Sequence, residues 1–141
     1  MRLLAGSLVT VSFPFTDLSA VKRRPALVLV VHREDLVLCG VTSKLSRGAD
    51  AIPLEDRGMV EGRLPKPSEI RPLKLFTIHR ALIRSVVGRV SPRTLDETVR
   101  LLVSALRSGK APGASAKGVG RTRRGASDRY LKTVRAIEKS I

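Results

Sequence analysis

The chain is short of cysteine, of long apolar runs and of acidic residues, and each shortage narrows what it can be. Its single cysteine, Cys39, excludes an internal disulfide and argues against a cysteine-based zinc site. No apolar run approaches the roughly 18 residues that a membrane span needs, and the first five residues are too short for a signal-peptide core. We therefore expect a soluble, cytoplasmic protein with no membrane partner.

Acidic residues are few: 12 Asp and Glu stand against 27 Lys and Arg, so the formal net charge is +15. A charge of this size points to a polyanionic partner, either a nucleic acid or an acidic protein. A merely basic soluble protein is the alternative. The length of 141 residues suits one domain with an appendage, and a 43% hydrophobic fraction suffices for a core.

Short apolar segments recur every eight to twelve residues with turn signals between them, which is typical of a small β-barrel. Residues 6–13 alternate with the two-residue period of a half-buried strand. Residues 25–31 form an uninterrupted apolar run, which predicts a strand that begins at Pro25 and is buried on both faces. Further strands are expected at 36–41, 51–54, 68–73 with 75–78 (two short strands or one bent strand) and 81–90, and long loops at 15–24 and 55–67.

A helix is predicted to close this domain. Ser91 can cap it, Pro92 suits its first turn and Gly109 ends it. The stripe expected to pack against the barrel consists of Leu95, Val99, Leu102, Val103 and Leu106.

The domain thus spans residues 1–109, and the composition then changes. Residues 110–126 are rich in Gly, Ala and Arg, which predicts a flexible basic linker. Residues 127–141 regain helical periodicity and are predicted to form a short amphipathic helical tail. An added RNA-binding arm and a region that orders on a partner both stay open as its role.

Arg24 is the first candidate for function. Pro25 pushes the residue before it toward extended geometry, so Arg24 is presented where the predicted strand meets the loop before it. A planar guanidinium held in this way has five fixed donors that suit phosphate oxygens. The alternative is an exposed loop charge.

Four ordered motifs resemble those of the MazF/PemK family of toxin endoribonucleases. They are GSLVTVSFPFTDL at 6–18, KRRPALVL at 22–29, VTS at 41–43 and KPSEIRP with KLFTI at 66–78. The resemblance covers about residues 6–108, and the set in this order is specific, whereas any one motif alone would be weak. It implies an SH3-like small β-barrel, mainly β with a C-terminal helix, that forms a homodimer. It also implies a protein that needs no metal or other cofactor, cuts single-stranded RNA and is held inactive by an acidic antitoxin.

The resemblance also implies the reaction and its residues. A ribose 2′-hydroxyl attacks the adjacent phosphate and leaves a 2′,3′-cyclic phosphate and a free 5′-hydroxyl. Arg24 matches the family's catalytic arginine, and Thr42 matches its catalytic threonine, with Ser43 beside it. Arg71 matches a position where some members use a catalytic arginine. The alternatives are a strand-end hydroxyl bonded to its own backbone for Thr42 and a solvated strand edge for Arg71.

The chain departs from the family at Leu73, where many relatives place an aspartate. Leucine cannot accept a proton, so either the general base lies elsewhere or the activity is weak. Asp17 in the first long loop is the best remaining carboxylate, although an aspartate there is also a turn former. His32 and His79 are interpreted as structural or exposed side chains.

Further cations are expected to rim the same groove and hold the RNA backbone. These are Lys22, Arg23, Lys44, Arg47 and Arg63. The phenylalanines Phe13, Phe15 and Phe76 are expected in the core, with base stacking on Phe15 as the alternative.

Two other functions stay open. One is a non-catalytic member of the fold that binds RNA or an acidic partner, an interpretation that rests on Leu73. The other is inhibition of a protein target such as a DNA topoisomerase.

Overall fold

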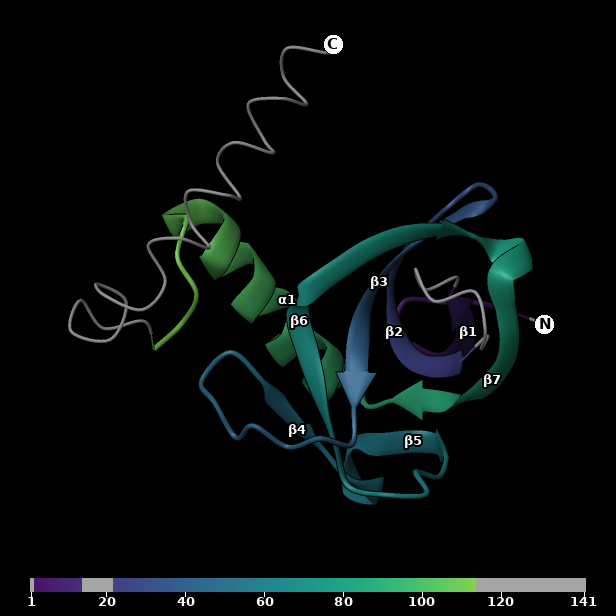
Figure 1. The fold of residues 1–141 in the computed structure, drawn as a ribbon, viewed down its shortest axis with the longest axis horizontal. Helices are drawn as coiled ribbons and strands as arrows, with labels where there is room; N and C mark the ends of the chain where they lie inside the picture. Colours follow the sequence, from purple (N-terminus) through teal and green to yellow (C-terminus); the bar gives the residue numbers. More distant parts are fainter. Residues whose placement is uncertain (1, 14–21, 114–141) are drawn as a thin grey trace, which may run out of the picture.

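Seven antiparallel strands form one curled sheet, and a helix packs against it (Figure 1). The structure is a computed structural model that describes residues 2–13 and 22–113. The elements are β1 (Ser7–Phe13), β2 (Lys22–His32), β3 (Asp35–Thr42), β4 (Ile52–Leu54), η1 (Asp56–Gly58), β5 (Met59–Gly62), β6 (Ser68–His79), η2 (Arg80–Leu82), β7 (Ile83–Val90) and α1 (Pro92–Ser108). The strands lie in the order β4-β6-β3-β2-β1-β7-β5 and curl into a half-barrel, so the predicted mainly β fold with a C-terminal helix is confirmed.

The core consists of two clusters on opposite faces of the central strands. The first, which α1 covers, contains Leu8, Leu27, Cys39, Val41, Ile52, Leu54, Ile70 and Val90. The second contains Leu3, Val9, Val11, Ala26, Val28, Leu36 and Leu38. Because side chains alternate along a strand, β1, β2 and β3 each supply both clusters. The prediction of a half-buried first strand is therefore wrong, since β1 is buried on both faces between β2 and β7.

β2 begins three residues before the predicted boundary, so Pro25 lies inside the strand. Residues 22–25 pair with β1 alone, because pairing with β3 starts at Ala26. The missing amide hydrogen of Pro25 is tolerated there, since one flank carries no partner strand. The predicted burial of the whole run is wrong at its end, where Val30 and Val31 are 50% and 40% exposed.

β6 is one bent strand, which resolves the two alternatives for residues 68–78. Cys39 of β3 lies opposite Leu75, whereas the next residue, Gly40, lies opposite Arg71. Residues 72–74 are therefore extra residues on β6 that form a bulge. Pro72 sits in this bulge, where no ladder hydrogen bond is required of it.

The predicted loop at 55–67 contains a short helix, η1, and a strand, β5, that the sequence pattern did not reveal. β5 is a four-residue edge strand that pairs with β7, with Gly62 opposite Gly88. Gly62 has φ +75°, and a Cβ there would lie 2.1 Å from the Val87 carbonyl oxygen. The close approach of the two backbones thus requires glycine at this position.

α1 has the predicted ends: Ser91 Oγ accepts from the Thr94 amide at 3.2 Å, and Gly109 adopts φ +71°. Its buried face differs from the prediction. The side chains that face the sheet are Thr94, Thr98 and Ala105, with Leu95 and Leu101 beside them, whereas Val99, Val103 and Leu106 are exposed. Small residues on the inner face allow the helix to approach the sheet closely.

From residue 114 on, the predicted linker and helical tail lie outside the described residues. Within residues 2–13 and 22–113, no helix is long and apolar enough to cross a membrane.

Candidate functional site

A cleft of about 440 Å³ opens where β2 starts, β3 ends and β6 bends. We call it the main cleft; its lining includes Arg24, Thr42, Lys44, Arg71, Lys74 and Phe76. A second hollow of about 460 Å³, the side pocket, adjoins it and adds Ser43 and Lys66. Arg24, Thr42 and Lys44 line both hollows and so lie at the boundary between them.

The charge of the two hollows has one sign. Five basic side chains line them, and no acidic residue of the described part of the chain does; the five are Arg24, Lys44, Lys66, Arg71 and Lys74. Low-dielectric walls concentrate the field of such a cluster. The two hollows therefore suit a polyanion.

Strand register brings Arg24 and Thr42 together. Ala26 lies opposite Gly40 in the antiparallel pair of β2 and β3. Two residues beyond this last pair, where β2 no longer pairs with β3, lie Arg24 and Thr42, and both line the main cleft. Gly40 also lies opposite Arg71 of β6, so three neighbouring strands contribute to the main cleft.

Both backbone polar groups of Lys44 form hydrogen bonds. Its amide nitrogen donates to Thr42 Oγ1 at 3.1 Å, and its carbonyl oxygen accepts from Arg71 Nη2 at 3.2 Å. The strand-end hydrogen bond considered for Thr42 is thus present. Because the Thr42 hydroxyl acts there as an acceptor, its own hydrogen stays free of this bond and can be donated elsewhere.

Glu69 anchors the far end of the same segment. Its side chain is only 3% exposed; Oε1 accepts from the Arg47 amide at 2.5 Å and Oε2 from the Ser46 hydroxyl at 3.1 Å. Arg71 Nη2 lies 3.6 Å from Oε2. Burial alone would raise the pKa of the Glu69 carboxyl, but these hydrogen bonds and the Arg71 charge together hold it below its usual value.

Of the other predicted site residues, some line the hollows and others do not. Ser43 lines the side pocket. Arg23 is exposed and, because neighbouring strand residues alternate, faces away from Arg24. Lys22 starts β2, and Asp17 lies outside the described residues. The remaining two cations of the predicted rim are exposed and line neither hollow; they are Arg47 and Arg63.

Sequence reasoning missed Lys66, Lys74 and Glu69 and placed Phe76 in the core. Phe76 packs against the second cluster and also lines the main cleft. Lys74 and Phe76 share a face of β6, but the bulge at 72–74 breaks the alternation that would have related them to Arg71. Glu69 belongs to the KPSEIRP motif but was not singled out as a site residue, because an acidic residue on a strand is ordinarily exposed.

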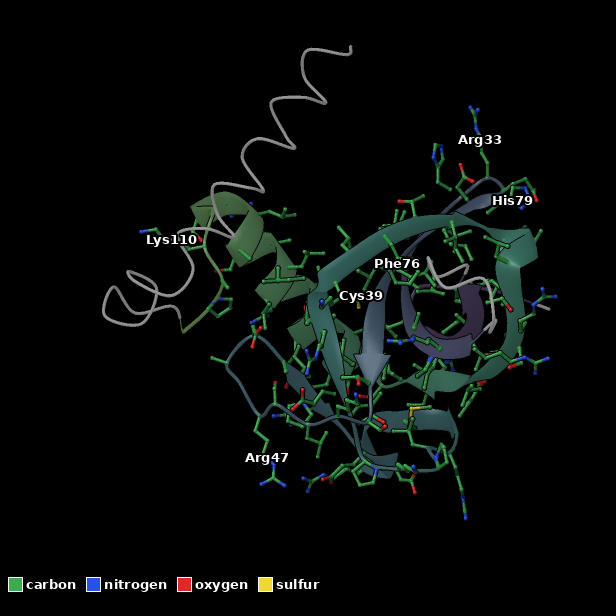
Figure 2. The ribbon with its side chains drawn as sticks, viewed as in Figure 1. Arg33, Cys39, Arg47, Phe76, His79 and Lys110 are labelled. Carbon is green, nitrogen blue, oxygen red and sulfur yellow. The ribbon has the colours of Figure 1, made fainter. Side chains whose placement is uncertain are left out.

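His79 and Cys39 lie outside this site. Figure 2 shows His79 at the end of the molecule that carries Arg33, whereas Arg47 lies at the opposite end. His79 Nδ1 accepts from the Ala81 amide at 3.0 Å and caps η2, as expected of a structural histidine. Cys39 is fully buried, and burial raises the pKa of its thiol to about 12.

Metal-ligating side chains do not gather in the described residues: no group of three His, Cys, Asp or Glu there could hold an ion.

A family profile matches this chain over residues 5–106, and its description is the PemK-like, MazF-like toxin of type II toxin-antitoxin systems. The chain belongs to this toxin family. The resemblance seen in the four motifs is thereby confirmed. Among proteins of curated function, no significant match to this PemK/MazF-family chain is found.

Solved structures share the fold of this toxin-family chain at low identity. The Mycobacterium tuberculosis toxin MazF-mt6 matches with a TM-score of 0.57 and 18% identity, over 72% of this chain and 96% of that one. An endoribonuclease in complex with its cognate antitoxin, from a mycobacterial species, gives 0.56 and 17%, over 74% and 93%. A MazE-MazF structure from Deinococcus radiodurans gives 0.60 and 23%, over 73% and 94%.

Proposed function

We propose that this chain is a cytoplasmic toxin endoribonuclease that cleaves single-stranded RNA without a metal. One observation carries the proposal: Arg24, Thr42 and Lys44 lie at the boundary of two hollows whose charged side chains are all basic. A phosphodiester at that boundary would have its negative charge beside these three residues. The nucleotides on its two sides would each enter a hollow.

The reaction needs little covalent chemistry from the protein. The ribose 2′-oxygen attacks the adjacent phosphorus, and the bond from phosphorus to the 5′-oxygen breaks. The products are a 2′,3′-cyclic phosphate and a 5′-hydroxyl. Negative charge builds on the non-bridging oxygens, where Arg24 donates guanidinium hydrogens and Thr42 donates its hydroxyl hydrogen. Fixed donors of this kind stabilise the transition state more than the substrate.

Two protons must also move. We assign removal of the 2′-hydroxyl proton to Asp17. The segment that contains it begins after Phe13, the last residue of β1, and ends before Lys22, the first residue of β2; these two residues pair with each other, and Lys22 lies two residues before Arg24. The 5′-oxygen takes up a proton as it leaves, through its hydrogen bonds to Arg24 or from solvent. Leu73 offers no group for either transfer.

Affinity for RNA is expected to come mainly from the five basic side chains of the hollows. If each neutralises one phosphate, the logarithm of the binding constant falls with that of salt concentration with a slope of about −3.5. Phe76 and the apolar wall around it provide a surface on which a base can stack.

The test uses the full chain with a mixed-sequence single-stranded RNA in EDTA, and the cleaved ends are mapped. Cyclic phosphate and 5′-hydroxyl ends are expected, with a loss on the order of 10²- to 10³-fold in rate for Arg24→Ala. Arg93→Ala is the matched control, because it removes an exposed α1 arginine whose side chain is 90% exposed. Intact RNA with the folded wild type, or equal cutting by both variants, overturns the proposal.

A second candidate function rests on Leu73, which is 40% exposed and stands where the family resemblance implies an aspartate in many members. A member without an efficient base would bind RNA or an acidic partner without turnover. Tight binding of the same RNA with no cyclic-phosphate product selects this function.

We also propose an acidic antitoxin as the natural inhibitor. The complexes of related proteins with cognate antitoxins support this partner, and an acidic segment would compete with RNA for the same five cations. If the adjacent reading frame encodes a small protein with an acidic tail, mixing that protein with this chain should abolish cutting in proportion to the complex formed. Full cutting in the saturated complex contradicts it.

A homodimer is proposed as the functional assembly. Val99, Val103 and Leu106 form an exposed stripe along α1, with 39%, 37% and 69% of each residue exposed. Contiguous apolar residues on a soluble protein are typical of an interface. Sedimentation of the wild type and of Val103→Asp tests this: a dimer that the variant disrupts supports it, and a wild-type monomer contradicts it.

A further inference from the structure

We propose that Glu69 is a positioning residue, which aims the Thr42 hydroxyl and fixes Lys44 through its ion pair with Arg71. The inference deepens the proposed ribonuclease function and rests on it for its catalytic meaning. Glu69 lies opposite Thr42 in the pairing of β6 with β3, so the two residues belong to one row across the sheet.

A continuous series of contacts leads from Glu69 to the cleft. Glu69 Oε2 holds Arg71 Nη2 at 3.6 Å, and the same Nη2 donates to the Lys44 carbonyl at 3.2 Å. The Lys44 amide then donates to Thr42 Oγ1 at 3.1 Å. This last bond occupies an acceptor site of the hydroxyl, so it restricts the direction in which the hydroxyl hydrogen points.

Besides contributing its charge to the main cleft, Arg71 acts in this series as a strut. Its side chain is 33% exposed, and its Nε is buried with no hydrogen-bond partner in the part of the chain that the structure describes. The guanidinium is therefore drawn inward, toward Glu69 and the Lys44 carbonyl. Without the Glu69 charge, it would be freed to turn toward solvent or RNA and would release the Lys44 peptide.

Glu69 also anchors the end of the same segment. Arg47 has φ +56°, a left-handed conformation that is unfavourable for a residue other than glycine. Its amide donates to Glu69 Oε1, and the Ser46 hydroxyl donates to Oε2. A strained conformation persists only where neighbouring contacts hold it. Both ends of the segment after β3 thus depend on one carboxylate.

Glu69 is not placed to be the general base. It lines neither hollow, and its two carboxylate oxygens accept hydrogen bonds from Ser46 and Arg47 in the segment after β3. A base would give the rate a pH dependence that disappears when the residue is replaced. A positioning residue lowers the rate by the same factor at every pH at which it is ionised.

The experiment measures kcat and KM of the full chain on a labelled single-stranded RNA from about pH 5 to pH 8, a range in which a carboxylate of lowered pKa stays ionised. Glu69→Gln keeps an oxygen for the Arg47 amide but loses the charge that holds Arg71. We expect kcat to fall by about tenfold, up to 10²-fold, at every pH, with KM within about twofold. Glu61→Gln is the matched control, because Glu61 pairs with Arg89 at 3.1 Å on an exposed edge.

Arg71→Gln breaks the same series at its next member. The double variant with Glu69→Gln should lose no more kcat than the larger single loss, because both changes interrupt one path. Additive losses, an unchanged kcat in Glu69→Gln, or a loss of the pH dependence in that variant each overturn the inference.

Amide exchange separates this inference from the proposed function. Glu69→Gln should speed hydrogen exchange at the Lys44 amide, which loses its support through Arg71, whereas Glu61→Gln should not. Unchanged exchange overturns the tether itself. Intact RNA with the wild type overturns the proposed function and with it the catalytic meaning of Glu69, whatever the exchange shows.

Discussion

Replacing Thr42 by valine tests whether its hydroxyl donates to the scissile phosphate. Valine keeps the shape of the side chain and removes only the hydroxyl. One preorganised donor is worth on the order of 10²- to 10³-fold in rate. Because Thr42 is only half-buried and borders two open hollows, we expect the lower end, about 10²-fold or about 2.7 kcal/mol of barrier.

The cost to stability should be much smaller. Thr42→Val removes the hydrogen bond from the Lys44 amide, but Lys44 is exposed and water can replace the lost acceptor. A loss of about 0.5 kcal/mol is therefore expected, which lowers Tm by about 3 °C. The large fall in rate cannot then be attributed to unfolding.

The assay is single-turnover cleavage of end-labelled RNA, with thermal unfolding of each variant alongside. Thr42→Ser should stay within about fivefold of the wild type, because it keeps the hydroxyl. Thr77→Val is the matched control, since Thr77 is exposed on β6 and lines neither hollow. A valine variant with nearly wild-type rate, or an equal loss in the control, refutes the assigned role.

Gly62→Ala should destabilise the fold more than Gly109→Ala. The two glycines have similar φ values of +75° and +71°, so the backbone strain of an alanine is similar at both positions. Only at residue 62 would the added Cβ also meet a neighbouring backbone oxygen, at 2.1 Å. Urea unfolding of both variants measures the loss of stability. Backbone strain alone costs about 1–2 kcal/mol, so equal losses of stability in the two variants would contradict the close approach of β5 and β7. The thiol of Cys39, whose pKa burial raises to about 12, should resist thiol reagents in the native state and react only when the chain unfolds. Prompt reaction of folded protein would show that the side chain is accessible. The pKa of Glu69 is lower in the folded state than its usual value of 4.5, so the unfolded state binds the extra proton. The stability from its charge is present above that value and lost as pH falls through the folded pKa, so Glu69→Gln should flatten the acid limb of stability below about pH 5. If the acid limb of the stability curve is the same in Glu69→Gln as in the wild type, the charge of Glu69 does not stabilise the fold.

Features set by near neighbours in the chain were predictable. Ser91 and Gly109 mark the ends of α1 because capping is decided within one turn. Most strands follow from short apolar runs between turn signals. β5 was not predicted, because it is a four-residue edge strand that ends in a glycine. The exposed stripe of α1 was assigned to the core, since periodicity cannot tell which apolar face meets the sheet when small residues form a second one.

The sequence by itself determined the sign of the charge, the strand-forming segments and, through four ordered motifs, the family and the candidates Arg24 and Thr42. Only the tertiary structure decided that these two residues line the same cleft, because that depends on the pairing of β2 with β3. It also decided that a bulge on β6 brings Lys74 into the cleft, and that a buried Glu69 holds the segment after β3. Pairings of this kind join residues far apart in the chain, and they are selected by the hydrogen-bond ladder and core packing together, which no local pattern contains.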